Sequence, residues 1–256
     1  MNKKTNLKKL FQYSLRLFFI FFTLFFLNSC GEIIEHYQCI MLVENGKFAE
    51  AIERLDMNIK SDPKNSAYYD LRGYAKIMSE YPDKQDALND LNYSIELSPT
   101  ISSPYIYRAR SYLELEMYSE AIEDCKIALK NCQSKTYRAN IYNLLGLIYL
   151  TSGDLHNALD QFNISLELNH RSDATAYGNR GLTYGRLGQF SDAYKDIEKA
   201  MLKNKKVGYK ERGLVKLLQF KDIDAQKDFN KHLEFFPNFK RNLDKTIEKY
   251  KLIRSN

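Results

Sequence analysis

Arginine and aspartate recur along the chain as a pair at a nearly constant separation. The pairs are Arg72 with Asp90, Arg108 with Asp124, Arg180 with Asp196, and Arg212 with Asp228. A carboxylate beside a polar group can act as a general acid or base, but arginine keeps its proton at any physiological pH. The four pairs are also spread over more than half of the chain. We therefore interpret them as structural ion pairs that join two segments.

Other residue types that often carry chemistry do not form a recognisable site. Gly178, Gly181, Gly185 and Gly188 lie close together, but they have neither the GxGxxG nor the GxxxxGK pattern of phosphate loops. No CxxC pair, HExxH motif or GxSxG motif occurs, and the four histidines are scattered. We expect no catalytic site, no metal site and no cofactor, so this protein is not expected to be an enzyme.

Three of the four cysteines, Cys39, Cys125 and Cys132, are expected to be free thiols. Cys125 and Cys132 are seven residues apart in what we predict to be one helix. Seven helical residues span about 10 Å, which exceeds the limit of about 7 Å for a disulfide. Cys39 belongs to a segment too distant in the repeat pattern described below to pair with either.

The first 29 residues differ in composition from the rest of the chain. They hold five of the 38 basic residues and none of the 32 acidic ones, so the rest of the chain is close to neutral despite a formal net charge of +6. A near-neutral body without a basic stripe argues against nucleic acid as a partner. The basic start is followed by an apolar stretch at Leu17–Leu27, which is shorter than the 20 or so residues of a membrane-spanning helix. This layout is typical of a secretory signal.

The end of this leader, Leu27-Asn28-Ser29-Cys30, resembles the bacterial lipobox. Leu27, Ser29 and Cys30 match that pattern, whereas Asn28 is more polar than the usual residue. The resemblance implies that residues 1–29 are a signal peptide and that Cys30 receives lipid, palmitate included. Each buried methylene contributes about 0.8 kcal/mol, so several acyl chains would hold the protein on a membrane. The alternative is a signal anchor that is never cleaved.

The rest of the chain repeats with a period of about 35 residues. An alanine recurs at Ala51, Ala87, Ala121, Ala158, Ala193 and Ala225. A small residue precedes it by twelve positions, or by fourteen in the second unit, at Cys39, Gly73, Ala109, Gly146, Gly181 and Gly213. A tyrosine stands four residues earlier in every unit but the first. These offsets predict two amphipathic helices that cross closely at the small residues.

At these offsets the sequence resembles a tetratricopeptide repeat protein. The fourth unit matches best, with Tyr142, Leu145, Gly146, Tyr149, Gly153, Ala158 and Phe162 in place. The resemblance implies an all-α fold, an α-solenoid of six helix-turn-helix hairpins within residues 30–238. We place the units at about 32–65, 66–101, 102–138, 139–173, 174–205 and 206–238. Residues 239–256 carry a helical apolar stripe and are expected to form a C-terminal capping helix, the alternative being a tail that binds a partner.

In the resembled family, the first helix of each unit lines a concave groove. The groove positions here are Ile40, Val43, Tyr74, Ile77, Arg110, Leu113, Leu147, Leu150, Leu182, Gly185, Leu214 and Leu217. Ten of these twelve are apolar or aromatic, and the lysine and asparagine clamp of the chaperone-tail version of the family has no matching set. The resemblance implies recognition of an apolar or amphipathic segment, whereas the alternative is that these side chains pack between neighbouring helices.

Three functions follow as hypotheses. The first is a scaffold in the bacterial cell envelope, tethered through Cys30, that binds a segment of another envelope protein. The second is a regulatory scaffold with an uncleaved anchor that faces the cytoplasm, and the third is a carrier of lipid or acyl chains. Gly31 after the cysteine favours the outer membrane by analogy with a sorting rule in which Asp at that position retains lipoproteins in the inner membrane.

Overall fold

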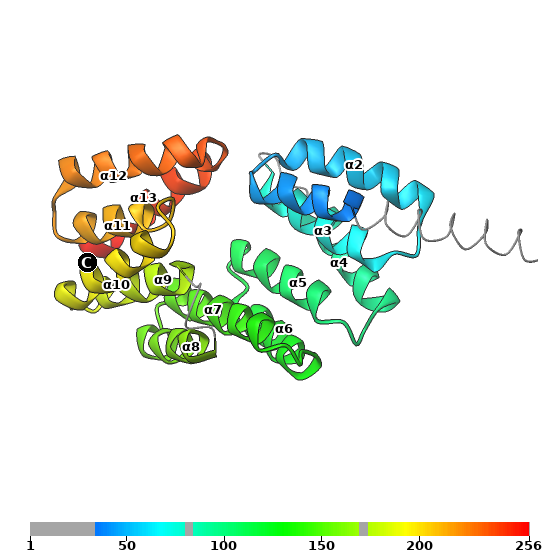
Figure 1. The fold of residues 1–256 in the computed structure, drawn as a ribbon, viewed down its shortest axis with the longest axis horizontal. Helices are drawn as coiled ribbons and strands as arrows, with labels where there is room; N and C mark the ends of the chain where they lie inside the picture. The colour runs from blue at the N-terminus through cyan, green and yellow to red at the C-terminus, as the bar shows by residue number, and fades with distance from the viewer. Residues whose placement is uncertain (1–33, 80–83, 169–173, 256) are drawn as a thin grey trace, which may run out of the picture. The chain divides into compact units, whose positions relative to one another are not determined.

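A computed structural model describes residues 34–79, 84–168 and 174–255 (Figure 1). The chain divides into two compact units, residues 1–41 and 42–256. In the first unit the structure describes the beginning of a helix that covers residues 34–44. The predicted signal peptide and the lipid-attachment residue Cys30 lie outside the described residues.

The second unit consists of successive helical hairpins and a terminal helix. The helices after residues 34–44 are α2 (Phe48–Ser61), α3 (Ser66–Met78), α4 (Lys84–Leu97), α5 (Ser102–Glu114), α6 (Tyr118–Asn131), α7 (Lys135–Ser152), α8 (Leu155–Leu168), α9 (Ala174–Arg186), α10 (Phe190–Lys203), α11 (Tyr209–Leu218), α12 (Asp222–Phe235), the 3-10 turn η1 (Pro237–Phe239) and α13 (Lys240–Ser255). No strand occurs among the described residues. The predicted all-α solenoid of hairpins is therefore confirmed.

Each hairpin closes around the small residue and the alanine that the sequence repeats. A Cβ atom added to Gly181 in α9 would lie 2.8 Å from the carbonyl oxygen of Ala193 in α10. One added to Gly146 in α7 would lie 2.5 Å from the ring of Phe162 in α8. Ala158 and Ala193 are fully buried. The helix backbones approach so closely that larger side chains do not fit at these positions.

The turn between the two helices of a hairpin has one residue in the left-handed region. It stands five positions before the repeated alanine in five of the units, at Gly46, Glu116, Gly153, Gly188 and Phe220. Glycine adopts this conformation freely, whereas Glu116 and Phe220 adopt it at an energetic cost of about 1–2 kcal/mol. Consecutive hairpins then stack, with α3 against α5 and α9 against α11.

One predicted boundary differs from the structure. Helix α7 begins at Lys135, four residues before the expected start of the fourth unit at residue 139. The chain must therefore turn between Asn131 and Lys135, and Cys132 adopts an extended conformation just beyond α6. Cys125 and Cys132 consequently do not share a helix, contrary to the sequence prediction. The thiols of Cys125 and Cys132 are free and buried, and Cys39 is buried as well.

The terminal helix α13 covers the apolar face of α11, as expected of a cap. Its side chains reach Thr151 at the end of α7 and Leu217 in α11, and it contacts α12 through Asp222 at that helix's first residue. The helix packs beside α11, and single side chains extend from it to α7 and α12 (Figure 1).

Candidate functional site

The structure brings together all four arginine and aspartate pairs. In each, Nε and Nη2 of the arginine donate to the two carboxylate oxygens, a bidentate geometry. The donor-acceptor distances are 2.8 and 2.6 Å for Arg72 with Asp90, 2.8 and 2.7 Å for Arg108 with Asp124, 2.6 and 3.1 Å for Arg180 with Asp196, and 3.0 and 2.7 Å for Arg212 with Asp228. Each pair joins the two helices of one hairpin, and all four aspartates are buried.

Three of these arginines each bind a third helix as well. The sequence analysis missed these contacts. The remaining nitrogen, Nη1, donates to Asp56, Asn92 or Asn163 on the second helix of the preceding hairpin, over 2.6, 2.8 and 2.7 Å for Arg72, Arg108 and Arg180. One guanidinium therefore holds two hairpins in register. The sequence contains a pattern that predicts these contacts, because the three acceptors all stand five residues after the repeated alanine.

The repeated tyrosine stacks under the arginine that follows it. The guanidinium carbons of Arg72, Arg108, Arg180 and Arg212 lie 5.4 to 5.7 Å from the ring centres of Tyr69, Tyr105, Tyr177 and Tyr209. The hydroxyls of Tyr69 and Tyr105 donate to the carbonyls of Pro63 and Pro99 in the preceding unit. The ring supports the cation and its hydroxyl fixes the turn between units.

The electrostatics agree with a structural role for these pairs. Burial alone would lower the pKa of Arg180, but the hydrogen bonds to Asp196 outweigh it and raise the pKa above its ordinary value. The same balance applies to Arg108 with Asp124. These arginines therefore stay charged at any pH at which the protein is folded, and they cannot transfer a proton.

The predicted groove residues divide by burial. Those that are buried are Val43, Ile77, Leu150, Leu182, Gly185, Leu214 and Leu217, whereas Ile40, Tyr74, Leu113 and Leu147 are half-buried and Arg110 is exposed. Much of the apolar surface predicted from the first helices is therefore covered. What covers it in the later units is α13, because its Leu243 and Tyr250 belong to the same apolar cluster as Leu182 and Leu214.

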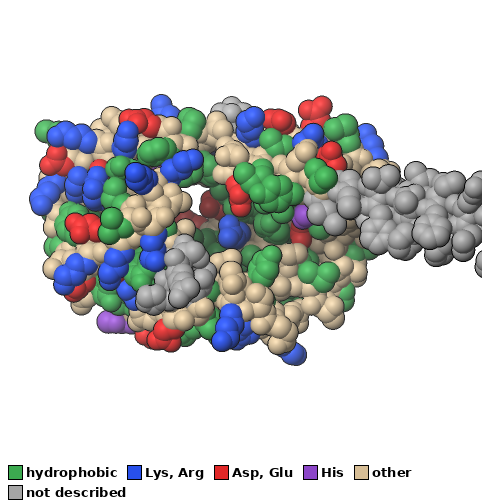
Figure 2. Space-filling view, viewed as in Figure 1, with side chains coloured by type: hydrophobic (Ala, Val, Ile, Leu, Met, Phe, Trp, Pro, Cys, Tyr) green, Lys and Arg blue, Asp and Glu red, His purple; other side chains and the backbone are tan. Residues whose placement is uncertain are grey.

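A cavity of about 650 Å³ remains between α13 and these first helices. Its lining includes five predicted groove residues, Leu113, Leu147, Leu150, Leu182 and Leu214, together with Tyr250 and Ile253 of α13. Figure 2 shows a hollow in the middle of the face on view, with charged side chains at its rim. Polar and charged residues, among them Glu114, Asn179 and Lys210, line the cavity together with these apolar side chains. Such a mixed lining suits an amphipathic segment.

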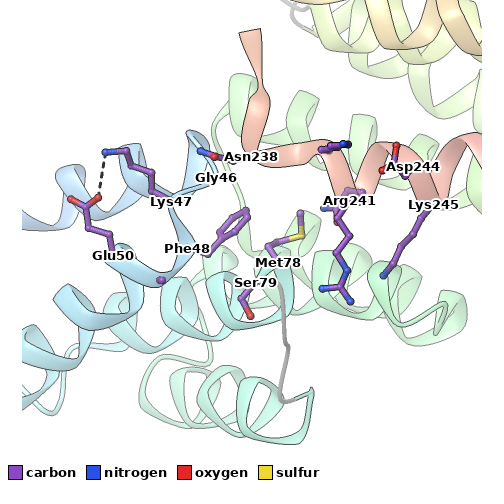
Figure 3. A pocket seen from close by; sticks show the side chains of 13 residues that line it. Gly46, Lys47, Phe48, Glu50, Met78, Ser79, Asn238, Arg241, Asp244 and Lys245 are labelled. Atoms are coloured by element: carbon purple, nitrogen blue, oxygen red, sulfur yellow. Dashed lines mark hydrogen bonds and ion pairs between the residues drawn. The ribbon is translucent and has the colours of Figure 1, made fainter. Parts of the chain in front are cut away.

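A second cavity, of about 870 Å³, lies between the turn that precedes α2 and the beginning of α13 (Figure 3). Phe48, Ala49 and Met78 are its apolar residues, and Arg241 and Lys245 extend from α13 near Phe48 and Met78. Lys47 at the rim is paired with Glu50 over 3.3 Å. Fewer of the residues that line this cavity are apolar than in the first cavity, so it is a weaker candidate for an apolar segment.

The open end of the groove, in the second and third units, is polar and aromatic. The rings of Tyr74 and Tyr107 are 5.3 Å apart, and the guanidinium of Arg110 lies 5.8 Å from Tyr74. Next to them Asp70 is buried, accepts a hydrogen bond from Ser103 over 2.8 Å, and has one carboxylate oxygen without a partner. Burial raises the pKa of Asp70 to about 8 despite the Ser103 hydrogen bond, so this carboxyl is protonated at neutral pH.

The described part of the chain contains no cluster of three or more histidine, cysteine, aspartate or glutamate side chains that is suited to a metal ion. In the same part, no helix is both long and apolar enough to cross a membrane. Burial raises the pKa of the Cys125 thiol to about 12, so this cysteine is an unreactive core residue.

Comparison with known proteins agrees with this geometry. The family model of the tetratricopeptide repeat matches residues 139–169 and 174–202. These two segments are tetratricopeptide repeats. The matched residues include the fourth and fifth hairpins, whose first helices contribute Leu147, Leu150 and Leu182 to the larger apolar cluster.

Two curated proteins with the same repeats are similar in sequence. Human tetratricopeptide repeat protein 13 is 28% identical over 165 residues, which cover 63% of this chain and 18% of that protein. Bovine tetratricopeptide repeat protein 36 is 33% identical over 94 residues, which cover 34% of this chain and 50% of that protein. The matched region thus spans at most half of the length of either relative.

Several solved structures share the fold. A tetratricopeptide repeat protein from Parabacteroides merdae superposes with a TM-score of 0.64 at 22% identity, over 88% of this chain and 84% of that one. A chain of the APC/C hetero-tetramer Cut9-Hcn1 superposes with a TM-score of 0.62 at 16% identity, over 86% of this chain and 42% of that one. PilF of Pseudomonas aeruginosa gives 0.56 at 13% identity, over 80% and 92%. At these identities the similarity concerns the fold alone.

Proposed function

We propose that this protein is a membrane-tethered scaffold in the bacterial cell envelope that binds an apolar or amphipathic segment of another envelope protein on its concave face. The observation that carries the proposal is the 650 Å³ cavity, in which leucines from the first helices of four successive hairpins line one apolar surface. Stacked helical repeats provide such extended surfaces for protein partners. The tether is inferred from the leader and from Cys30.

The tether is tested by metabolic labelling with palmitate. The wild-type protein is expected to carry the label and to sediment with membranes, because acyl chains on Cys30 partition into the bilayer. Cys30→Ala should lose both properties. Cys39→Ala is the matched control, since its thiol is buried, and it should keep the label. Label retained in Cys30→Ala would overturn the tether.

The binding face is tested by site-specific photocrosslinking in cells. A photoreactive residue at Leu147, in the cavity, is expected to crosslink to a defined segment of one envelope protein, identified by mass spectrometry. The same residue at Lys126, which is exposed on α6, is the control and should not yield that product. Equal crosslinking from both positions would contradict binding on the concave face. Native mass spectrometry that finds a bound lipid in the purified protein would instead support a lipid carrier.

A further inference from the structure

Helix α13 is amphipathic, and its apolar side is directed at the groove. Leu243, Ile247, Tyr250 and Ile253 follow one another at spacings of four, three and three residues, which places them on one side of a helix. Leu243 and Tyr250 are buried, and Ile247 and Ile253 pack against the same cluster of groove leucines. Leu252, on another side of the helix, is 69% exposed.

The polar contacts of α13 reach several hairpins. Lys249 donates to the carbonyl of Thr151 at the end of α7 over 3.4 Å, and it lies 3.9 Å from Glu116 in the turn after α5. Arg254 donates to the carbonyl of Leu217 in α11 over 3.0 Å. One helix that contacts several successive repeats on their concave side has the geometry of a helix bound in a groove.

Charge complementarity supports the same interpretation. Helix α13 carries six basic and two acidic side chains among residues 240–255. The charge of Lys245 acts on Glu114, which lines the 650 Å³ cavity with Glu116. Burial raises the pKa of Glu114, while Lys245 and then Lys210 oppose that rise. Arg186 and Lys210 also line this cavity, so the acidic part of its rim is confined to Glu114 and Glu116. A basic amphipathic helix fits the leucines and these two carboxylates.

The packing of α13 is incomplete along its length. The 650 Å³ cavity lies directly against Tyr250 and Ile253, whereas the cores of the hairpins are closely packed. Its polar anchors stand near its two ends, where Asn238 donates to the carbonyl of Asn45 over 2.9 Å and Arg254 pairs with Asp222. Space left unfilled beside an apolar helix forfeits favourable contacts. A better-fitting helix would recover them.

From these contacts we propose that α13 is an internal ligand of the concave groove, which a basic amphipathic helix of the partner displaces. The partner helix carries apolar residues with the spacing of Leu243, Ile247, Tyr250 and Ile253, and lysine or arginine opposite Glu114 and Glu116. Because the partner binds only molecules in which α13 has left the groove, its apparent affinity is lower than its affinity for the open groove. The proposal rests on the proposed function, because both require that the groove binds a helix.

The experiment measures binding of a fluorescent peptide with the sequence of residues 239–256 to full-length protein by fluorescence anisotropy. The released variant, Leu243→Asp with Tyr250→Asp, detaches α13 and leaves every groove leucine in place. It is expected to bind the peptide at least tenfold more tightly than the wild type. Lys251→Asp is the control, because Lys251 is exposed on the same helix and does not line the cavity, and it should bind like the wild type. A peptide with the same two aspartate substitutions should bind to none of them.

A second variant guards against a folding defect in the first. Asn238→Ala with Arg254→Ala removes polar anchors near the ends of α13 and leaves its apolar face unchanged. It should also bind the peptide more tightly than the wild type does, and circular dichroism should show unchanged helicity. In the wild type, saturating peptide should speed hydrogen exchange in α13.

The outcomes separate the two proposals. Equal affinity of the wild type and both variants would overturn displacement of α13 while leaving a groove that binds helices. An absence of binding to all proteins, with helicity intact, would overturn both the displacement and the proposed binding of an amphipathic helix.

Discussion

At the scale of single residues, the repeated arginine holds neighbouring helices of the solenoid together. Arg180 binds Asp196 with two nitrogens and Asn163 with the third, so one side chain joins α8, α9 and α10. Buried ion pairs often contribute little net stability because both charges lose their hydration. Their bidentate geometry, however, is compatible with only one relative position of the two helices of a hairpin. We therefore regard these pairs as determinants of register.

The fourth hairpin shows how to test this role, because it has Leu145 and Gln161 in place of the pair. Arg180→Leu or Asp196→Gln alone is expected to lower the free energy of unfolding by about 1–3 kcal/mol, since Asp196 keeps only Lys199 and Arg180 keeps only Asn163 as a partner. The double variant should cost less than the sum, with a coupling energy above about 1 kcal/mol in chemical denaturation. The exposed pair Asp192 with Lys195 is the control and should give a coupling near zero. A coupling near zero for both pairs would mean that the buried contact does not fix the hairpin.

The buried carboxyl of Asp70 predicts a pH dependence of stability. Its pKa is about 8 in the folded protein and near 3.8 in the unfolded chain, so the folded state holds an extra proton between those values. The free energy of unfolding should then fall as the pH rises from about 4 to 8, by up to about 1.4 kcal/mol per pH unit. Asp70→Asn removes the titration while keeping an acceptor for Ser103. Denaturation at several pH values should show a flatter profile and higher stability at pH 8 for this variant.

Ser103→Ala provides the complementary measurement. It removes the hydrogen bond that opposes the rise in the pKa of Asp70, so the pH dependence should persist and shift to higher pH. If Asp70→Asn leaves the pH profile of the wild type unchanged, Asp70 is ionised in the folded protein and the assignment is wrong.

At the scale of helices and hairpins, the repeated glycines are necessary because the two helices of a hairpin approach each other closely. Gly181 and Gly178 lie on the same helix but differ in their surroundings. A Cβ atom at Gly181 would lie 2.8 Å from a backbone oxygen and 2.9 Å from Ile197, whereas one at Gly178 would lie 3.5 Å from its nearest neighbour, Glu211. The first position is blocked by backbone that cannot move without opening the hairpin.

Gly181→Ala is therefore expected to destabilise the protein by about 1–3 kcal/mol, the usual cost of overpacking. Gly178→Ala is the matched control and should be neutral or stabilising by up to about 1 kcal/mol, because alanine favours helix more than glycine does. Thermal denaturation of the two variants compares the effects directly. Equal melting temperatures would contradict the packing argument.

The sequence was informative about hairpins because their determinants are local. The offset between the small residue and the alanine defines a crossing within one unit, and the joint occurrence of Arg180 with Asp196 marks a contact between two helices of that unit. Contacts between units were harder to predict. The acceptors Asp56, Asn92 and Asn163 belong to a different hairpin from their arginines, and only comparison across neighbouring units reveals them.

The position of α13 could not be predicted for a related reason. Its periodicity showed that one face is apolar, but an apolar stripe does not specify which surface covers it. Both the end of the stack and the concave groove offer leucines. The structure resolves this through side chains such as Lys249 and Arg254, whose acceptors are backbone carbonyls of Thr151 and Leu217. Backbone acceptors leave no pattern in the sequence.

At the scale of residues 42–256 as a whole, one contact joins the first and last units, which is unusual in a repeat protein. Units in a solenoid touch only their neighbours, so the first and last units fray independently. Here Asn238 donates to the carbonyl of Asn45, 193 residues earlier, and the rings of Phe48 and Phe239 meet edge to face with centres 6.0 Å apart. Gly46 fits beneath Asn238, since a Cβ atom there would lie 2.8 Å from the Cβ of Asn238. The first turn and the segment before α13 are therefore energetically linked.

This link predicts that the two ends open together. Asn238→Ala with Phe239→Ala removes a hydrogen bond of about 1 kcal/mol and an aromatic pair of about 0.5–1.5 kcal/mol. Backbone hydrogen exchange should become roughly tenfold faster in α2 and in α13 alike, since about 1.4 kcal/mol corresponds to a factor of ten. Helices α7 and α8 should keep their exchange rates. Glu248→Ala with Lys251→Ala, an exposed pair on α13 that does not line the cavity beside Phe48, is the control and should leave all four helices unchanged. If only α13 exchanges faster in the first variant, the ends are not coupled, and the solenoid behaves as an ordinary linear array whose last helix is attached at one end.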